Sequence, residues 1–382
     1  MTTIEKVETF LVPPRWLFVR VQTSDGLVGW GEPVVEGRAE TVRTAVEQLA
    51  EGLVGSDATR IEDTWQVMTK GTFYRGGPVL SSAVAGIDQA LWDLAGKRLG
   101  VPVHTLLGGH VRDRIRVYAW VGGDDPAEVA EQVSARIESG LTAVKMNASG
   151  RMSRLATVRE LDGVVERVAR AREVLGDDRD IALDMHGRFT AANARRLLPA
   201  LEPMRPFFVE EPVTPENSHL LRGVVDSTSI PIATGERLYN RQDFLPVLQA
   251  GVAVVQPDLS HAGGISEVRR IASLAETFDV ALAPHCPLGP ISLAASLQVG
   301  FASPNHLIQE QSIGIHYNTG ADVLDYVVDR SVFDFADGWI HRLTGPGLGI
   351  EVDEDAVREA DRTPHGWRSP VWRHPDGSFA EW

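Results

Sequence analysis

The sequence is poor in cysteine, contains no long hydrophobic run and has fewer basic than acidic residues. Cys286 is the only cysteine among 382 residues, which excludes an internal disulfide and favours a reducing cytoplasm. No stretch of 18 apolar residues occurs, and the N-terminus has no basic start followed by an apolar run. We therefore expect neither a membrane-spanning helix nor a signal peptide.

The deficit of positive charge also bears on the partners of the chain. Lys and Arg number 37 against 52 Asp and Glu, which gives a formal net charge of −15. An acidic chain has no electrostatic reason to bind nucleic acid or an anionic membrane. Gly29-Trp30-Gly31 lacks the further glycine of a dinucleotide-binding fingerprint, and no Walker-type loop occurs, so a nucleotide cofactor is not expected.

The first part of the chain has the pattern of an α+β unit. Two β-rich runs flank Ser24-Asp25-Gly26 within residues 16–32, which predicts a hairpin. Residues 39–55 and 81–100 have the apolar spacing of helices, and Gly100 is a typical helix terminator.

From about residue 115 the pattern becomes regular. Short apolar runs recur, most of them separated by segments of helical spacing, at 115–120, 143–147, 181–186, 207–212, 231–236, 252–258, 280–285 and 306–311. Eight alternations of strand and helix, with strands apolar on both faces, predict an α/β fold of the (β/α)8 or TIM-barrel type. The final residues, 362–382, hold three of the nine tryptophans, and we expect them to pack onto the N-terminal unit.

Polar side chains end six successive predicted strands. They follow one another at intervals of 22 to 27 residues, about the length of one βα unit, and are Asp184, Glu210, Glu236, Asp258, His285 and Glu310. The C-terminal ends of barrel strands carry the active site in enzymes of this fold. We therefore expect these six side chains to meet at one site.

Three of these groups, Asp184, Glu210 and Glu236, are predicted metal ligands. Carboxylates from adjacent strands would repel one another in a half-buried site unless a cation lay between them. Oxygen ligands favour a hard ion, so Mg²⁺ is the first choice and Mn²⁺ the second. The alternative is three unrelated acids that are salt-bridged to their neighbours.

Two histidines flank this predicted metal site. His186 lies on the same face of its strand as Asp184, where it could be a metal ligand, a proton donor or a histidine of the core. Asp258 and His285 end adjacent strands, so the carboxylate could orient the imidazole and raise its basicity, or the two could form a structural ion pair. An acid and a base on opposite sides of a substrate are what an elimination requires.

Other polar positions leave more than one role open. Glu310 could hydrogen-bond a developing enolate or position another side chain. Lys145 and Asn147 share one face of the second barrel strand, where Lys145 could neutralise a substrate carboxylate or form a salt bridge. Cys286, beside His285, points to the opposite face and is expected to pack.

Residues 85–109, AGIDQALWDLAGKRLGVPVHTLLGG, together with the three strand-end acids, resemble the mandelate racemase branch of the enolase superfamily. Further matching segments cover most of the chain and include LDMHGR (183–188), QPDLSHAGGI (256–265) and LAPHCPLGPISLAA (282–295). The resemblance implies an α+β capping domain over a modified (β/α)7β barrel, completed by the C-terminal tail. The corresponding limits are 1–114 for the capping domain, 115–345 for the barrel and 346–382 for the tail.

The resemblance also implies roles for the residues. It assigns the three acids to Mg²⁺, makes His285, supported by Asp258, the base at C2 of a sugar acid, makes His186 the acid at C3 and lets Glu310 stabilise the intermediate. Many superfamily members carry Lys-x-Lys on the second strand, with the second lysine as a base. Here the sequence is Lys145-Met146-Asn147, which disfavours a racemase that uses this lysine.

The expected activity is that of a hydro-lyase, the Mg²⁺-dependent dehydration of D-galactonate to 2-dehydro-3-deoxy-D-galactonate. The alternatives are dehydration of another aldonic acid such as gluconate, an acid-sugar epimerase or racemase, and a metal-stabilised binding protein without turnover. Candidate substrate-binding residues are Lys145, Asn147 and Trp16, with further positions near Arg15 and at Tyr74-Arg75. The resemblance implies a symmetric homo-oligomer, often an octamer.

Overall fold

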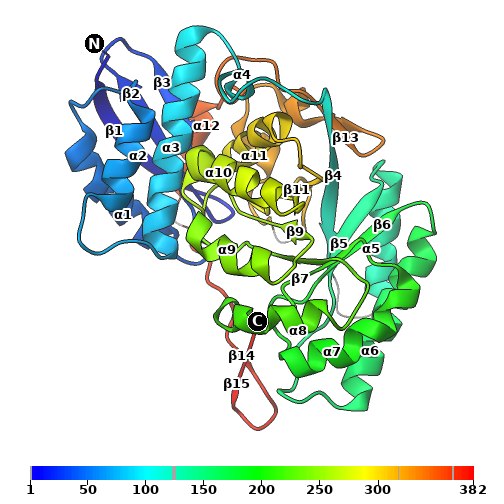
Figure 1. Ribbon diagram of the computed structural model, residues 1–382. Coiled ribbons are helices and arrows are strands. Elements are labelled where there is room, and N and C mark those ends of the chain that lie inside the picture. Colours follow the sequence, from blue (N-terminus) through cyan, green and yellow to red (C-terminus); the bar gives the residue numbers. More distant parts are fainter. Residues whose placement is uncertain (1, 123–125, 317, 364) are drawn as a thin grey trace.

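A computed structural model of the chain describes residues 2–122, 126–316, 318–363 and 365–382. Its N-terminal part is an antiparallel sheet of β1 (Ile4–Val12), β2 (Trp16–Thr23) and β3 (Val28–Gly31) (Figure 1). The sheet packs against α1 (Ala39–Leu53) and α3 (Pro78–Leu99), and α2 (Ile61–Lys70) packs on α3. The predicted hairpin is confirmed by the β2–β3 pairing, and Gly26 has φ +85° in its turn. Gly100, with φ +68°, ends α3 as predicted, because glycine adopts this left-handed conformation without steric cost.

The second part is a barrel of parallel strands, as the apolar runs predict. Along the sheet lie β4 (Arg114–Val121), β5 (Ala143–Asn147), β6 (Asp180–Asp184), β7 (Phe208–Glu210), β8 (Ile232–Thr234), β9 (Val254–Val255) and β10 (Ala281–Leu282). β11 (Gln309–Gln311) pairs with β4, and Leu282 bridges to His306, so the sheet closes on itself. Each of the eight predicted strands is present.

Helices follow the first seven barrel strands. They are α5 (Pro126–Glu138), α6 (Val158–Leu175), α7 (Ala191–Leu201), α8 (Leu221–Val225), α9 (Arg241–Gln249), α10 (Gly264–Thr277) and α11 (Pro290–Ala302). After β11 the described chain forms 3₁₀ turns and the short strands β12 (Phe335–Ala336) and β13 (Trp339–His341). β13 pairs with the first residues of β4, Arg114 to Arg116. The architecture is therefore the (β/α)7β variant of the barrel with an added N-terminal unit, which confirms the fold class.

The inside of the barrel is filled by one apolar residue from each strand or its edge. This layer consists of Tyr118, Ala143, Ala182, Phe208, Ala233, Val254, Ala283 and Ile308. Tyr118 and Phe208 are the two aromatic residues of this layer, and their rings are in T-shaped contact. Packing of this kind leaves the strand ends, rather than a pore, as the place for polar chemistry.

Two buried carboxylates attach the N-terminal unit to the barrel. Glu32, just after β3, accepts hydrogen bonds from the amides of Gly289 (2.7 Å) and Ser292 (2.9 Å) at the start of α11. Asp88 of α3 accepts from the amide (2.9 Å) and hydroxyl (2.6 Å) of Ser266 at the start of α10. The first turn of a helix has unpaired amides, so each carboxyl group supplies hydrogen-bond acceptors to a barrel helix from the neighbouring unit.

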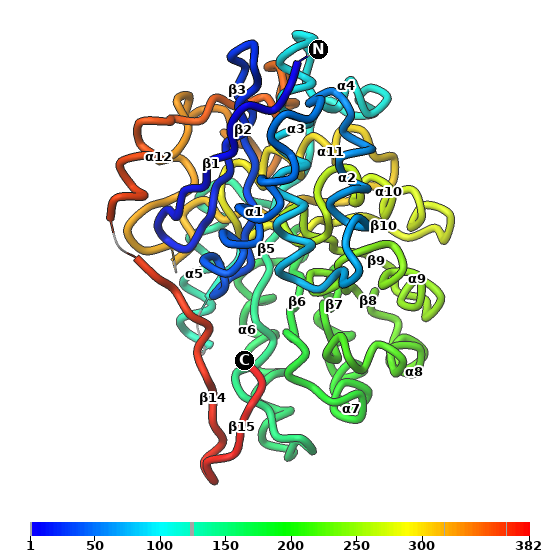
Figure 2. The backbone as a smooth tube through the Cα atoms, turned by 90° about the vertical axis from the view of Figure 1, so that its left-hand side faces the viewer, coloured from blue at the N-terminus to red at the C-terminus, as the bar shows by residue number. Residues whose placement is uncertain are grey.

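The C-terminal tail returns to the N-terminal sheet before it reaches the barrel. α12 (Glu354–Asp361) packs on β1, the amide of Leu11 donates to Asp361 (2.7 Å), and Arg20 pairs with Glu354 (3.1 Å). Figure 2 shows the red tail leaving α12 and running along one edge of the molecule to a hairpin of β14 (Trp372–Arg373) and β15 (Phe379–Ala380). α12 thus completes the capping unit. The expected packing of residues 362–382 onto that unit holds for Trp367, which lies near Arg15, but not for Trp372 and Trp382, which contact the barrel residues Arg188 and His186. The domain limits at 114, 115, 345 and 346 stay a prediction. Within the described residues, no helix is long and apolar enough to cross a membrane.

Candidate active site

The strand ends meet at a cavity of about 870 Å³. Parallel pairing places Asn147 beside Asp184 and Asp184 beside Glu210, because these residues end β5, β6 and β7 in register. The residues that line the cavity include, from the predicted set, Lys145, Asn147, Asp184, His186, Glu236, His285 and Glu310. The equal spacing of βα units along the sequence therefore corresponds to one cluster in space.

Asp184, Glu210 and Glu236 form a carboxylate cluster. One oxygen from each of them lies within 4.8 Å of the others, and an oxygen of each is buried without a hydrogen-bond partner in the described chain. Burial raises the pKa of Glu210 well above its usual value, and the charges of Asp184 and Glu236 raise it further, although Lys145 opposes them. Crowded carboxylate oxygens that lack hydrogen-bond partners are what a hard divalent cation would satisfy, so these residues fit Mg²⁺.

Lys145 connects this cluster to Glu310. Its side chain is 1% exposed, and its Nζ lies 2.9 Å from Glu210 Oε2, 2.9 Å from Glu310 Oε1 and 3.5 Å from Asp184 Oδ2. Burial opposes the charged form, but the carboxylates of Glu210 and Glu310 outweigh it and raise the pKa of Lys145 well above its usual value. Lys145 is therefore a buried cation in salt bridges with Glu210 and Glu310, and its role toward a substrate carboxylate stays a prediction.

His285 is held by Asp258. Its Nδ1 lies 2.8 Å from Asp258 Oδ2, and the other oxygen of Asp258 accepts the amide of Ser260 (2.6 Å). The free edge of the ring, Nε2, lies 3.4 Å from Glu236 Oε2 at the cavity. Burial disfavours the charged imidazole, yet Glu236 and the hydrogen bond to Asp258 together raise the pKa of His285 well above its usual value. The pair has the geometry of an oriented base.

His186 lies on the other side of the carboxylate cluster, directly after β6. Its backbone has φ +47°, which is uncommon for a residue with a side chain, and its amide donates to Asp184 Oδ1 (2.7 Å). Nε2 lies 3.2 Å from Asp184 Oδ2, Nδ1 lies 3.1 Å from Arg188 Nη2, and the ring stacks on Trp120 with centroids 5.5 Å apart. The turn aims the imidazole into the cavity instead of the core.

Glu310 makes two contacts that fix its carboxylate. Oε1 pairs with Lys145, as above, and Oε2 accepts the amide of Cys286 (3.0 Å). Cys286 is fully buried, with its sulfur 3.7 Å from Ser292 Oγ, so its predicted packing role is confirmed.

The predicted substrate-binding positions divide into two groups. Lys145 and Asn147 line the cavity, and Asn147 Oδ1 is buried without a hydrogen-bond partner among the described residues. Trp16 does not line the cavity, contrary to its prediction as a substrate-binding residue. Its ring is fully buried in the core of the capping unit, against Phe18 and Tyr326. Tyr74 is 83% exposed and also lies outside the lining.

Arg15, at one of the further candidate positions, lines the cavity. Lining residues that were not predicted as site residues from sequence are Arg188, Arg237 and the tail tryptophans Trp367, Trp372 and Trp382. Arg188 and Arg237 directly follow predicted strand ends, so a search two residues beyond each strand would have found them.

Glu36 and His261 also line the cavity and form an ion pair across the two units, 3.4 Å apart. Burial disfavours the charged form of both groups, but their partners outweigh the effect of burial. His261 lowers the pKa of Glu36 to about 2, and Asp258 and Glu36 raise the pKa of His261 to about 9. Asp258, His261 and His285 form a second cluster with metal-ligand spacing. Both oxygens of Asp258 already accept hydrogen bonds, which fits an orienting role better than metal binding.

Comparisons with known proteins identify the family of the chain. Residues 9–108 match the model for the N-terminal domain of mandelate racemase and muconate lactonizing enzymes, and residues 128–356 match the enolase C-terminal domain-like model. A D-galactonate dehydratase of Variovorax paradoxus is 53% identical over 380 residues, which is 99% of this chain and 100% of the relative. The D-galactonate dehydratase of Pectobacterium atrosepticum is 51% identical over the same shares.

Solved structures of similar shape include an enolase from Agrobacterium radiobacter with bound sodium and L-malate. Its TM-score is 0.91 at 34% identity, over 100% of both chains. A mandelate racemase/muconate lactonizing enzyme from Sulfitobacter reaches 0.89 at 29% identity, over 98% of this chain and 99% of that one. The similarity extends over both structural units and not the barrel alone.

Proposed function

The chain belongs to the mandelate racemase and muconate lactonizing enzyme family of the enolase superfamily, and we propose that it dehydrates D-galactonate to 2-dehydro-3-deoxy-D-galactonate with Mg²⁺. It is a hydro-lyase that acts on a sugar acid. One observation carries the finer proposal: His186 and the Asp258-supported His285 line the same cavity as Asp184 and Glu236 of the carboxylate cluster, and Glu210 is buried beside these two acids.

His285 is proposed to remove the proton from C2 of the substrate. Its Nδ1 is engaged by Asp258, so Nε2 is the nitrogen that faces the cavity and accepts the proton. Asp258 keeps the ring in one orientation and stabilises the imidazolium that forms. The electrons of the broken C2–H bond pass toward the substrate carboxylate.

His186 is proposed to act at C3. The C3–O bond breaks as His186 gives its proton to the departing hydroxyl, which leaves as water, and a C2–C3 double bond forms. The resulting enol tautomerises to the 2-keto-3-deoxy acid. Asp184 and Arg188 contact the two ring nitrogens, which supports a fixed orientation of the imidazole at this step.

Asp184, Glu210 and Glu236 would hold Mg²⁺. When bound, the ion supplies positive charge that stabilises the charge developing on the substrate carboxylate. Lys145 and Glu310 are proposed to keep the neighbouring charges balanced and in place, since Lys145 contacts both the metal-binding acids and Glu310. Asn147 is proposed to hydrogen-bond the substrate through its buried amide oxygen.

D-galactonate is the proposed substrate because the full-length relatives at 51% and 53% identity carry that activity in their names. Another aldonic acid such as gluconate is the nearest alternative, since the same residues would serve it. A racemase remains less well supported, because Asn147 stands where a second lysine would be needed. A symmetric homo-oligomer, such as an octamer, is part of the proposal.

The experiment is a screen of purified protein with Mg²⁺ against a panel of aldonic and aldaric acids, with 2-keto-3-deoxy product detected by semicarbazide absorbance. Turnover of D-galactonate above the other acids, lost on chelation and restored by Mg²⁺, is expected. Turnover of a different acid would overturn the substrate and keep the reaction. Absence of product from every acid, with the metal bound, would overturn the dehydratase.

A further inference from the structure

The tail beyond α12 forms part of the wall of the cavity. Its residues Trp367, Ser369, Pro370, Trp372 and Trp382 line it together with the strand ends of the barrel. Figure 2 shows that the hairpin of β14 and β15 lies far from the N-terminal sheet and that the chain then turns back toward the barrel. A segment that completes the capping unit thus extends to the place where we propose the chemistry.

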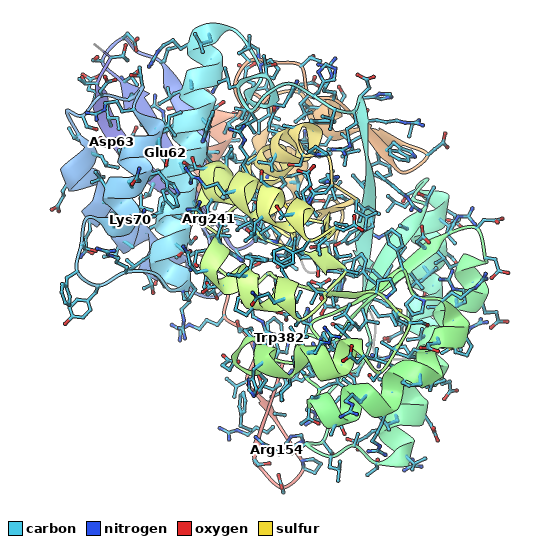
Figure 3. The ribbon with its side chains drawn as sticks, in the orientation of Figure 1. Glu62, Asp63, Lys70, Arg154, Arg241 and Trp382 are labelled. Atoms are coloured by element: carbon cyan, nitrogen blue, oxygen red, sulfur yellow. The ribbon has the colours of Figure 1, made fainter. Side chains whose placement is uncertain are left out.

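Within this segment, the indole of Trp382 stacks on the imidazole of His186. The ring centroids are 6.5 Å apart and the planes are inclined by 26°. Trp367 packs against Trp382 at 5.9 Å, and Trp120 of β4 stacks on the same imidazole at 5.5 Å. Aromatic rings stacked at such distances attract one another in addition to the apolar area that they bury. Figure 3 labels Trp382 below α9, beside the barrel.

Two arginines and a close backbone contact hold the tail near these tryptophans. The guanidinium of Arg188, which also contacts His186 Nδ1, lies 4.7 Å from the ring centre of Trp372. Arg15 lies 5.8 Å from the ring centre of Trp367. A Cβ atom at Gly37, which follows β3 in the N-terminal unit, would lie 3.2 Å from Ser369, so the tail packs closely against the backbone of Gly37. These contacts fix the course of the tail across the cavity.

We propose that Trp382 is a positioning residue, supplied by the tail, that holds the His186 imidazole in line with the leaving C3 hydroxyl. This inference rests on the proposed function, because His186 must be the acid for its orientation to matter at C3. The backbone of His186 is in the sparsely populated left-handed region, so its side-chain direction depends on the groups around it. The stacked indole restricts rotation of the imidazole out of its plane.

Positioning of His186 by Trp382 should affect only one of the two steps of the reaction. Removal of the C2 proton depends on His285 and Asp258, which the tail tryptophans do not contact through any described hydrogen bond or ring stacking. Loss of the C3 hydroxyl depends on His186. A positioning residue for His186 should therefore change the balance between exchange of the C2 proton and dehydration, whereas damage to the whole site would lower both together.

The test compares Trp382→Ala, Trp382→Phe and the control Phe379→Ala. Phe379 lies on the same hairpin, is 60% exposed and does not line the cavity. Each variant is incubated with Mg²⁺ and D-galactonate in D₂O, and loss of the substrate C2 proton and formation of keto acid are followed by NMR. For Trp382→Ala we expect the ratio of C2 exchange to dehydration to rise about tenfold, which corresponds to a modest displacement of a catalytic group. Trp382→Phe should restore most of the ratio, and Phe379→Ala should match the wild type.

A second measurement does not need turnover. In histidine-labelled protein at one fixed pH, the His186 ring signal, assigned by its absence in His186→Asn, should move in Trp382→Ala as the indole ring current is lost. An unchanged signal, or an unchanged ratio of exchange to dehydration, would overturn the positioning role. If the wild-type protein itself forms no keto acid, the proposed function is contradicted. That outcome is distinguished from failure of the positioning role, because it is measured without any variant.

Discussion

His285 and Asp258, at the ends of adjacent barrel strands, share a hydrogen bond of 2.8 Å between Nδ1 and Oδ2 in a buried setting. Because the second oxygen of Asp258 accepts the amide of Ser260, the carboxylate has no freedom to turn away from the ring. The pair therefore leaves a single ring nitrogen, Nε2, toward the cavity.

Replacing Asp258 by Asn should disable the base without unfolding the site. The amide can still accept from Ser260, but it no longer carries the charge that stabilises the imidazolium. We expect Asp258→Asn to lower the rates of both dehydration and C2 exchange by about 10²- to 10⁴-fold. Steady-state kinetics and NMR in D₂O measure the two rates, and wild-type exchange in this variant would show that the pair is only structural.

Replacing His285 by Asn should remove the base itself. Both turnover and C2 exchange should fall below detection, while the metal content, measured on the same protein, stays that of the wild type. Asp258→Asn and His285→Asn should not be additive, because both act through one group. Exchange that survives in His285→Asn would assign the base to another residue.

The carboxylate cluster predicts that Mg²⁺ stabilises the protein. A ligand present at about 100 times its Kd adds about 2.7 kcal/mol to the free energy of unfolding. Thermal unfolding of the wild type should therefore move to higher temperature with added Mg²⁺, and Asp184→Asn should lose most of this shift. Asp180→Asn is the matched control at the opposite end of β6, where the carboxylate pairs with Arg116 instead. Equal shifts in the two variants would contradict a metal site at Asp184.

The buried contact of Asp88 with α10 predicts a pH-dependent stability. Burial raises its pKa from 3.8 to about 7, against the opposing hydrogen bonds from Ser266 and the charge of Arg270. The folded protein therefore holds this proton more tightly than the unfolded chain. The contribution of the group is fully present below about pH 4 and is lost as the pH rises through 7, with a slope of at most about 1.4 kcal/mol per pH unit.

Asp88→Asn keeps a hydrogen-bonding side chain but cannot ionise, so it should become more stable relative to the wild type as the pH rises from 5 to 8. Urea unfolding of both proteins at several pH values measures the difference. A difference that is constant over this range would contradict a raised pKa at Asp88.

The barrel and its strand-end groups could be predicted from sequence because both follow local periodicity. Each βα unit has nearly the same length, so Asp184, Glu210 and Glu236 recur at regular intervals, and strand pairing then brings them together. The closing of the barrel by pairing of the last strand with the first follows from the same repetition.

The remaining cavity residues depend on contacts between distant parts of the chain. Glu36 meets His261, and Trp382 meets His186, across separations that no periodicity encodes. The misplacement of Trp16 has a related cause. β2 is buried along nearly its whole length, so the pattern does not distinguish a residue that faces the core from its neighbour Arg15, which faces the cavity.

The most direct test of the division between base and acid is His186→Asn with Mg²⁺ and D-galactonate in D₂O. We predict that dehydration falls by about 10²-fold or more while the C2 proton of the substrate still exchanges, with the metal content unchanged. Dehydration at the wild-type rate, or loss of exchange together with dehydration at full metal content, would contradict the assignment of His186 as the acid.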